Sequence, residues 1–350
     1  MFKSKITIIL CITFGIIALA WKVSLDNMPQ SEIVKTSLFP SLIDNINDIN
    51  IITIEDRKFK TILNRIDGTW YLGNKDNYPA LTNGIKRLTL ELSNLEVLET
   101  KTSSVEKYSK LGVGDLSKEN SQASLITLSV DDKNLTSLLV GFTPQGNNKT
   151  QRYVRQLNEP TAKLVDGRIS VSTNPIDWLD PQIIDLDSKN IKQLRIEVPD
   201  QKEIIISKNT GSEDFFALQD IPNGLEVKSK TIVSSIPAVL MDLRLNDVIA
   251  AKIFANSDAS QKTTISTFDG LKITLIDFDW KGKYYTVFKA SLEKPESELV
   301  KPNDGRTKAK IDTINKRLEG WAYEIPAYKR RMINRKFADL VKKVETSNGS

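Results

Sequence analysis

The stretch that decides the fold is residues 49–98, INIITIEDRKFKTILNRIDGTWYLGNKDNYPALTNGIKRLTLELSNLEVL. Apolar residues alternate with polar ones over 49–54 and 59–66, which is typical of strands with one buried face. An Asp-Gly pair at 67–68 separates the second run from Thr69–Leu72 and is a strong hairpin signal. This part of the chain therefore predicts an antiparallel meander, with Trp70 and Leu72 on one face.

The second half of the same stretch predicts a helix. Apolar residues recur every three or four positions after Asn83, at Ile85, Leu88, Leu92 and Leu95. We expect an amphipathic helix that packs on the meander and ends in Leu95–Leu98.

The chain repeats this order of features about 145 residues later. A strand-like run begins at Ile191, and a helical segment ends in Leu243-Arg244-Leu245. The corresponding pairs are Ile49 and Ile191, Trp70 and Phe216, and Leu95 and Leu243, so the offset rises from 142 (191 − 49) to 148 (243 − 95). A fixed order with a slowly drifting offset is the mark of an internal repeat.

These patterns predict an α+β protein with two similar lobes of mostly antiparallel sheet and packed helices, after one N-terminal transmembrane helix. The expected organisation is an anchor at 1–25, a linker at 26–45, a first lobe at 46–188 and a second lobe at 189–345. With 350 residues, of which 40% are hydrophobic, the chain is long enough for more than one core.

The last part of the chain predicts two helices and a strand. The spacing of Ile311, Ile314 and Leu318 predicts a helix over 307–318, residues 321–326 predict a last strand, and residues 331–344 predict a closing helix. That closing helix would bury Ile333, Phe337, Leu340, Val341 and Val344. Pro237 lies inside the second repeat's helix, so that helix either begins near Ser235 or kinks there.

Composition excludes several classes of site. The chain has no histidine and one cysteine, Cys11, which excludes Ser-His-Asp and Cys-His catalysis and His- or Cys-ligated metal centres in the body. Without Lys3, Lys5 and Lys22 the body carries 46 basic and 44 acidic residues, which gives a net charge of about +2. Such a balance argues against nucleic acid as a partner. We predict no cofactor.

The N-terminus predicts a membrane anchor. Residues 6–20 are apolar apart from two threonines and a cysteine, basic residues precede them, and Trp21 and Lys22 follow. Extended to Leu25, this helix spans about 30 Å, the thickness of the hydrocarbon core. A cleaved signal peptide is the alternative, with Ala18-Leu19-Ala20 as its site. Either way the basic flank stays inside and the body is exported.

Paired carboxylates are the main acid/base groups left to a chain without histidine. Asp177, Asp180, Asp185 and Asp187 lie in one acidic segment, and Asp277 and Asp279 alternate along a strand. We interpret the first group as turn and cap residues, and the second as the solvent face of a half-buried strand. The sequence therefore assigns no catalytic or metal-binding residue. The two Ser-x-x-Lys matches, at Ser104 and Ser291, lack their companion motifs and are chance matches.

Aromatic and basic side chains form the remaining candidate partner or ligand surface. Its members are Trp70, Tyr153, Tyr285, Trp321, Arg330, Arg331 and Arg335. Aromatics at repeated strand positions are also typical of a core, and the arginines are also typical of a solvated helix face. Both explanations stay open at this point.

The chain resembles a family of bacterial proteins, the domain of unknown function numbered 4340. The resemblance rests on the N-terminal anchor, Gly68–Leu72, the helix after it, Arg152–Arg155 and the terminal Tyr323–Pro326, and it covers roughly 46–343. It implies a membrane-tethered extracytoplasmic module, often near gliding-type ABC transporter components. No catalytic residues follow from it.

The expected function is therefore that of a non-enzymatic accessory or binding protein. We expect a single-pass protein of the bacterial inner membrane, with its body in the periplasm and an ABC-type transport complex as its partner. One alternative is a carboxylate-dependent glycan- or peptidoglycan-processing enzyme. Another is a glycan- or ligand-binding module with its site between the lobes.

Overall fold

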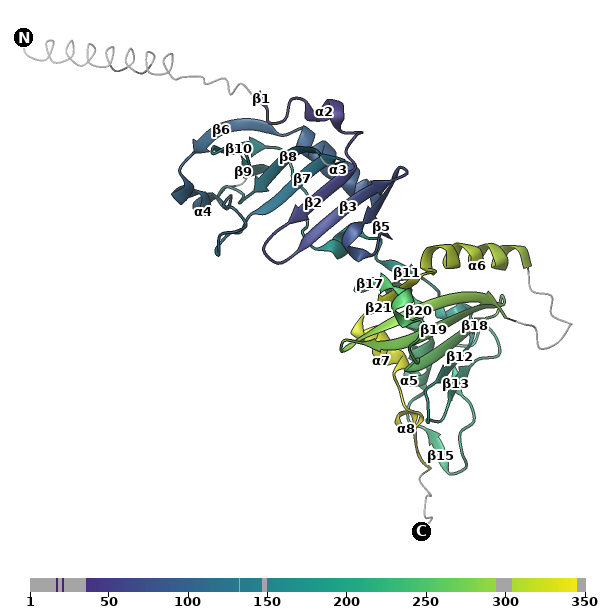
Figure 1. Ribbon diagram of the computed structural model, residues 1–350. Coiled ribbons are helices and arrows are strands. Elements are labelled where there is room, and N and C mark those ends of the chain that lie inside the picture. Colours follow the sequence, from purple (N-terminus) through teal and green to yellow (C-terminus); the bar gives the residue numbers. More distant parts are fainter. Residues whose placement is uncertain are drawn as a thin grey trace, which may run out of the picture. The chain divides into compact units, whose positions relative to one another are not determined.

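The computed structural model describes residues 17, 21, 36–131, 133–146, 150–293 and 304–344 (Figure 1). The chain forms two compact units. One comprises Met1–Ile46, Thr89–Ala123 and Leu138–Ile169, and the other comprises Asn47–Leu88, Ser124–Ser137 and Ser170–Ser350.

The first sheet has ten strands in the order β1-β6-β10-β9-β8-β7-β2-β3-β4-β5. Its strands are β1 (Thr36–Ser37), β2 (Ile51–Glu55), β3 (Lys60–Ile66), β4 (Thr69–Leu72), β5 (Tyr78–Pro79), β6 (Glu96–Thr102), β7 (Ser124–Val130), β8 (Lys133–Val140), β9 (Gln151–Gln156) and β10 (Ala162–Asp166). The predicted hairpin at 67–68 is confirmed, because Arg65 lies opposite Trp70 and both turn residues have positive φ. Trp70 and Leu72 are buried on one face of β4, as expected.

The predicted amphipathic helix is α3 (Thr82–Ser93), and it buries Ile85, Leu88 and Leu92. The expected helix end was wrong, because the chain forms strand β6 from Glu96. Tertiary pairing decides this, since β6 has β1 on one side and β10 on the other to take its backbone hydrogen bonds.

The second sheet has eight strands in the order β14-β13-β12-β18-β19-β20-β21-β17. Its strands are β12 (Ile191–Glu197), β13 (Ile204–Ser207), β14 (Ala217–Leu218), β17 (Asp247–Ala250), β18 (Gln261–Thr267), β19 (Leu271–Trp280), β20 (Lys283–Leu292) and β21 (Trp321–Glu324). Both sheets are mostly antiparallel, and several helices accompany them, so the coarse α+β class is confirmed.

The two sheets share one strand order. Written from the other edge, the second sheet reads β17-β21-β20-β19-β18-β12-β13-β14, and the first contains β6-β10-β9-β8-β7-β2-β3-β4. When the strands of each list are numbered by their order along the chain, the two lists become identical. The residue pairs that the repeat aligns are buried alike, because Ile49, Ile191, Leu95 and Leu243 are fully buried and Trp70 and Phe216 are each 6% exposed. The domain boundaries at 46–188 and 189–345 stay a prediction.

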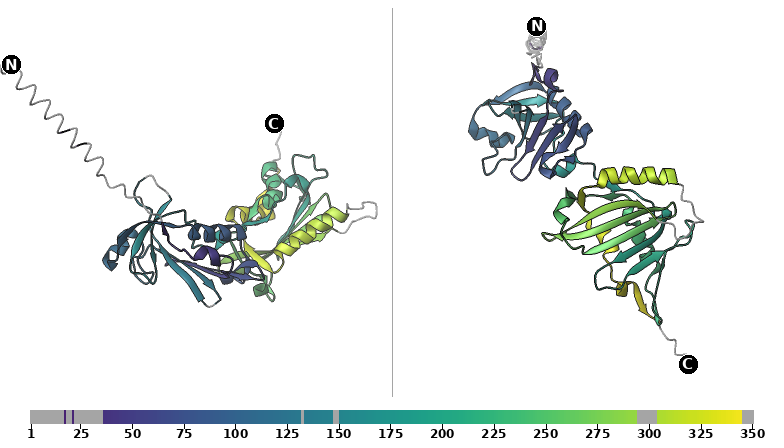
Figure 2. Two further views of the ribbon diagram at one scale, coloured as in Figure 1. Left: turned by 90° about the horizontal axis from the view of Figure 1, so that it is seen from above. Right: turned by 45° about the vertical axis from the view of Figure 1, so that its right-hand side comes forward.

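The sheets differ in which connections between strands contain additional residues. The connection from β6 to β7 carries η2 (Val105–Lys107) and α4 (Tyr108–Leu111), whereas the one from β17 to β18 carries only η6 (Ala251–Phe254). The connection from β20 to β21 carries α6 (Asp304–Leu318), whereas five residues join β9 to β10. Figure 2 shows α6, in yellow-green, along the second sheet.

The second repeat's helix is broken at its proline. α5 (Lys230–Ser235) ends and the 3-10 helix η5 (Ile236–Leu240) begins, which places Pro237 in a first turn, where its missing N–H costs nothing. The expected helical end at 243–245 was wrong, because Leu243 and Arg244 form β16, which pairs with β11 (Gln182–Ile184).

The closing helix over 331–344 was also wrong. The chain forms α7 (Ala327–Ile333), then α8 (Phe337–Leu340) and then β22 (Val341–Lys343). β22 pairs with β15 (Leu225–Val227), and this pairing draws the chain out of the helix. Val344 is consequently 47% exposed, although Ile333, Phe337, Leu340 and Val341 are buried as expected.

The predicted anchor at 1–25 lies outside the described residues, apart from Ile17 and Trp21. Within the described part of the chain, no helix has the length and apolar character needed to cross a membrane. In the predicted linker, residues 36–45 form β1 and α2 (Leu42–Asn45), and they bury Leu38, Phe39 and Leu42.

Candidate functional site

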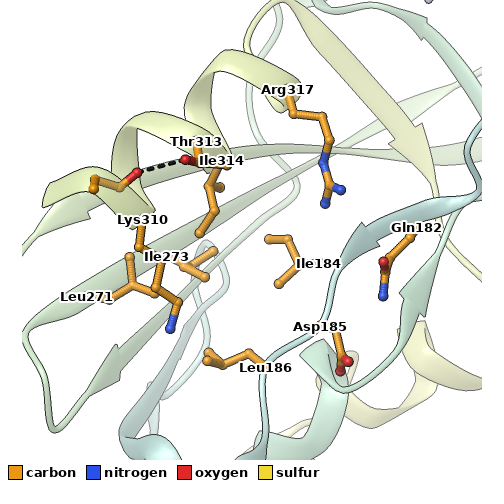
Figure 3. A pocket seen from close by; sticks show the side chains of 11 residues that line it. Gln182, Ile184, Asp185, Leu186, Leu271, Ile273, Lys310, Thr313, Ile314 and Arg317 are labelled. Atoms are coloured by element: carbon orange, nitrogen blue, oxygen red, sulfur yellow. Dashed lines mark hydrogen bonds between the residues drawn. The ribbon is translucent and has the colours of Figure 1, made fainter. Parts of the chain in front are cut away.

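A cavity of about 460 Å³ lies beneath α6, and we call it the α6 pocket (Figure 3). Its walls are α6, the start of β19 and the segment from β11 to Leu186. Its volume falls in the range of small-molecule sites. The apolar lining consists of Ile184, Leu186, Leu271, Ile273, Ala309 and Ile314, and the polar lining consists of Gln182, Asp185, Lys310, Thr313 and Arg317.

Helix α6 is held over the sheet by Asn315. Strand β20 pairs with β21 only at Thr286 and Val287, so the backbone of Ala290 has no strand partner on that side. The Asn315 side-chain amide takes that place, because its Oδ1 accepts from the Ala290 N–H and its Nδ2 donates to the Ala290 carbonyl, both at 2.9 Å. A side chain thus covers a strand edge that would otherwise be open.

The first turn of α6 has a second attachment. Thr307 is buried, and its hydroxyl donates to the Asp269 carbonyl at 3.0 Å. Ile311 and Leu318 are also buried, whereas Ile314 faces the cavity. Because both ends of the helix are attached, its middle stands over Leu271 and Ile273, and the cavity is the space left there.

Two cations from α6 point into the cavity, at its two ends (Figure 3). Lys310 and Arg317 are seven residues apart, which is two helical turns or about 10.5 Å. The Arg317 guanidinium donates from Nη2 to the Ile183 carbonyl, and the residue as a whole is exposed. Lys310 has a distant partner, since its Nζ lies 3.9 Å from Asp269 Oδ2.

Two other polar groups of the α6 pocket are hydrogen-bonded within the fold. The Thr313 hydroxyl donates to the Ala309 carbonyl at 2.8 Å. The Asp185 carboxylate accepts from the Asp242 N–H at 2.8 Å. The pocket therefore offers an apolar middle, two cations and the Gln182 side chain, an arrangement suited to binding.

The structure places the predicted aromatics in separate clusters. Trp70 is 6% exposed, with the Arg65 guanidinium 5.8 Å from its ring centroid. Trp321 is half-buried, with its ring 4.8 Å from that of Tyr78. Tyr153 is half-buried against a cluster of Tyr108, Val113 and Ala162. None of the three lines the α6 pocket.

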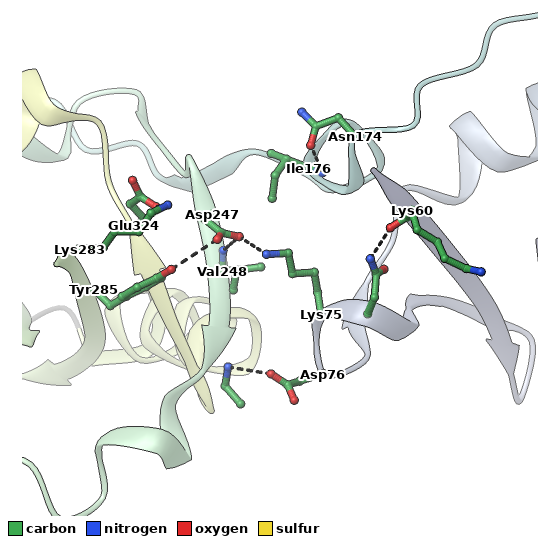
Figure 4. Close-up of polar contacts among 12 residues, drawn as sticks. Lys60, Lys75, Asp76, Asn174, Ile176, Asp247, Val248, Lys283, Tyr285 and Glu324 are labelled. Carbon is green, nitrogen blue, oxygen red and sulfur yellow. Dashed lines mark hydrogen bonds and ion pairs between the residues drawn. The ribbon is translucent and has the colours of Figure 1, made fainter. Parts of the chain in front are cut away.

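Tyr285 is buried with Phe254 and Phe278, and its hydroxyl joins a polar network around Asp247 (Figure 4). The Tyr285 hydroxyl donates to Asp247 Oδ2 at 3.4 Å, and Lys75 Nζ pairs with Asp247 Oδ1 at 2.6 Å. Burial raises the pKa of Tyr285, and the Asp247 charge raises it further. These contacts give Tyr285 a structural role.

The three predicted arginines differ in exposure. The half-buried Arg330 guanidinium lies 3.3 Å from the Tyr284 ring centroid and 3.9 Å from Asp277 Oδ2. Arg335 is half-buried, and Arg331 is exposed. The partner surface predicted from the aromatics and these arginines stays a prediction.

The candidate carboxylates are held by local hydrogen bonds. Asp177 accepts from the Ser172 hydroxyl at 2.5 Å, and Asp180 accepts from the Gln182 N–H at 3.0 Å, as expected of turn residues. Asp279 is exposed. Among the described residues, no group of three or more Asp, Glu, His or Cys side chains has a geometry that would hold a metal ion.

Asp277 does not belong to the solvent face that the alternation suggested for it. It is 1% exposed, because it continues the buried face of Leu271, Ile273 and Leu275 along β19. The Thr286 hydroxyl donates to its Oδ1 at 2.5 Å. Burial raises the pKa of Asp277, and the Thr286 bond and the Arg330 charge oppose that rise.

A second, smaller cavity of about 210 Å³ lies in the connection from β6 to β7. Its lining includes Tyr108, Asp115, Lys118 and Gln122. Nearby, the buried Arg155 donates from Nε to the Val113 carbonyl at 3.2 Å and pairs with Asp115. This cavity is smaller than typical ligand sites.

Sequence reasoning missed the α6 pocket, although two signals for it were present. They were the extra segment before β21 and the seven-residue spacing of Lys310 and Arg317. The opposite wall comes from Gln182–Leu186, more than 120 residues earlier, and only tertiary contact brings it to the helix.

These features define a protein of two antiparallel sheets with a cavity of ligand size. The chain belongs to the family described as Domain of unknown function (DUF4340), whose model matches residues 70–267, more than half of the chain. The predicted resemblance is therefore confirmed. Helix α6 follows the matched residues. No curated protein matches the chain.

Proposed function

We propose that this chain is a membrane-tethered, extracytoplasmic binding protein without catalytic activity, which serves an ABC-type transport complex of the bacterial envelope. The α6 pocket is its binding site. The single observation that carries the proposal is this cavity of about 460 Å³, with an apolar middle and two cations from one helix.

The types of residue in the chain and in the pocket support ligand binding rather than catalysis. The chain has no histidine, and its one cysteine lies in the N-terminal apolar segment. The pocket's one carboxylate, Asp185, is occupied by a backbone N–H. Catalysis by an acid and a base needs two such groups within reach of the substrate.

The tether rests on the sequence alone. An apolar run at 6–20 with basic residues on its N-terminal side favours an exported body behind a retained helix. A cysteine label applied to intact spheroplasts tests this. A cysteine introduced at the exposed Lys316 reacts if the body is extracytoplasmic and is protected if it is cytoplasmic.

The partner is tested by crosslinking the full-length protein in cells, followed by affinity purification from solubilised membranes and mass spectrometry. We expect an ABC permease or its envelope component in near-stoichiometric amount. Ala309→Trp, which fills the α6 pocket, is the matched variant for Lys316→Trp on the outer side of the same helix. Recovery of no transport component with the unmodified protein contradicts the proposal.

The alternative is a carboxylate-dependent enzyme, because paired carboxylates are the main acid/base groups of a chain without histidine. Its test is incubation of the full-length protein and of Asp277→Asn with envelope glycans and peptidoglycan. If the full-length protein turns over one of these substrates and Asp277→Asn does not, the chain is an enzyme and our proposal is wrong.

A further inference from the structure

The lining of the α6 pocket, as well as its volume, indicates the kind of ligand that it would bind. Figure 3 shows Ile184, Ile273 and Ile314 around its middle, with Lys310 towards one end and Arg317 towards the other. An apolar ligand body gains free energy by leaving water there, at about 25 cal/mol per Å² of buried surface. A polar group of the same ligand has to lie at one of the two ends.

Arg317 is the better prepared of the two ends. Its bond to the Ile183 carbonyl commits one of five N–H donors. The planar guanidinium can bind a carboxylate through two parallel hydrogen bonds. Lys310 has a flexible stem, and that stem covers apolar surface at the other end.

The charges of the lining set the charge of the ligand. Lys310 and Arg317 contribute two positive charges, and Asp185 and Asp269, the partner of Lys310, contribute two negative charges. Because Asp269 is paired with Lys310, Arg317 is the cation of the lining to which a single anionic group can bind. A ligand with two anionic groups would place one of them near Asp185 or near Asp269, the partner of Lys310.

We propose that the α6 pocket binds an aliphatic monocarboxylate. The carboxylate pairs with Arg317, and the chain lies over Ile184, Ile273 and Ile314 towards Lys310. This inference rests on the proposed function, because it names the ligand class of the same site.

The test is equilibrium dialysis of radiolabelled octanoate against the full-length protein in lipid nanodiscs. Empty nanodiscs of the same lipid composition correct for partition into lipid. We expect saturable binding to the unmodified protein and to Lys316→Gln, which changes an exposed lysine outside the pocket lining. Octan-1-ol has the same chain without the charge, and we expect it to compete at least about tenfold more weakly, as loss of a charged hydrogen bond implies.

Two variants locate the ligand. Arg317→Gln weakens octanoate binding at least about tenfold if the guanidinium holds the carboxylate. Ala309→Trp abolishes it, because the indole fills the cavity. The octanoate and octanol comparison uses the unmodified protein, so it holds even if Arg317→Gln fails to fold.

Equal competition by octan-1-ol, or unchanged octanoate binding by Arg317→Gln, overturns the ligand class, and the α6 pocket stays a binding site. Absence of saturable octanoate binding also overturns it. If Ala309→Trp also recovers the crosslinked transport partner in unchanged amount, the role of the α6 pocket in the proposed function falls too. The two failures are therefore distinguishable.

Discussion

The two sheets of this protein have the same strand order and keep different additions. In the first sheet the addition joins β6 to β7, and the buried Arg155 holds it through the Val113 carbonyl, Asp115 and the Tyr108 ring, whose centroid lies 4.5 Å from the guanidinium. In the second sheet the addition is α6, which Asn315 holds to the edge of β20.

Strand order and the two cavities therefore depend on different parts of the chain. Alternating apolar residues fill both cores in the same way, so the order of strands carries no chemistry of its own. The smaller cavity lies in the connection from β6 to β7, and the α6 pocket lies between α6, β19 and residues 182–186. A polar side chain attaches each of the two added segments. Breaking those attachments one at a time separates the two roles.

The largest expected effect comes from Arg155→Ala in the first sheet. The substitution removes a buried cation, leaves the Val113 carbonyl without its donor and exposes the Tyr108 ring. We expect a loss of about 3 kcal/mol in the free energy of unfolding, measured by urea denaturation. Arg152→Ala, at a half-exposed position of the same strand, serves as control and should change it by less than about 0.5 kcal/mol. Equal effects would refute the anchoring role of Arg155.

Gly141→Ala tests how closely the first addition packs on the end of β8. A Cβ at this position would meet the Leu111 carbonyl oxygen and lie 2.8 Å from Val113 Cγ1. We expect a loss of about 2 kcal/mol, since the contacting backbone has to move. Gly114→Ala is the matched control, because no atom lies within 4 Å of its Cβ. Thermal unfolding of both variants measures the difference.

Asn315→Leu tests the attachment in the second sheet. It keeps a side chain of similar size but leaves the N–H and carbonyl of Ala290 without their partner. We expect a loss of about 1.5 kcal/mol, with water able to reach part of that edge. Hydrogen exchange of the Ala290 amide should speed up, while exchange in the first sheet stays the same. An unchanged rate at Ala290 would mean that Asn315 does not cover the edge.

The smallest expected effect is a pH dependence from Asp277, the buried carboxyl of the second sheet. Burial raises its pKa above the ordinary value of 3.8, so the folded state binds its proton more tightly than the unfolded state does. Stability from this group is therefore present below pH 3.8 and is lost as the pH rises through the folded pKa. In Asp277→Asn the free energy of unfolding should not show this decrease when it is measured from pH 3 upward. If the pH profiles of the two proteins are parallel, the prediction is wrong.

Much of the fold was predictable because it depends on local patterns. The hairpin at 67–68, helix α3, helix α6 and most strands follow from the spacing of apolar residues and from turn chemistry. The errors share one cause. Residues 96–98, 243–244 and 341–343 were assigned to helices, and each forms part of a strand because a partner strand from another part of the chain pairs with it.

The candidate site was less predictable than the fold. The predicted aromatics are spread over separate clusters, and Asp277, expected at the surface, is buried on a core face. The α6 pocket needs walls from residues 182–186, 271–273 and 309–317 at once. No local sequence pattern indicates that these three segments pack together.

The alternation that builds the two large sheets, and the lack of histidine that excludes histidine-dependent catalysis, can be read from the sequence alone. Only the tertiary structure decided that Asn315 replaces a strand at Ala290 and that Arg317 lies across a cavity from Lys310. The physical reason is the range of the forces. Periodicity acts between residues a few positions apart, whereas a cavity and its charges exist only where distant segments pack together.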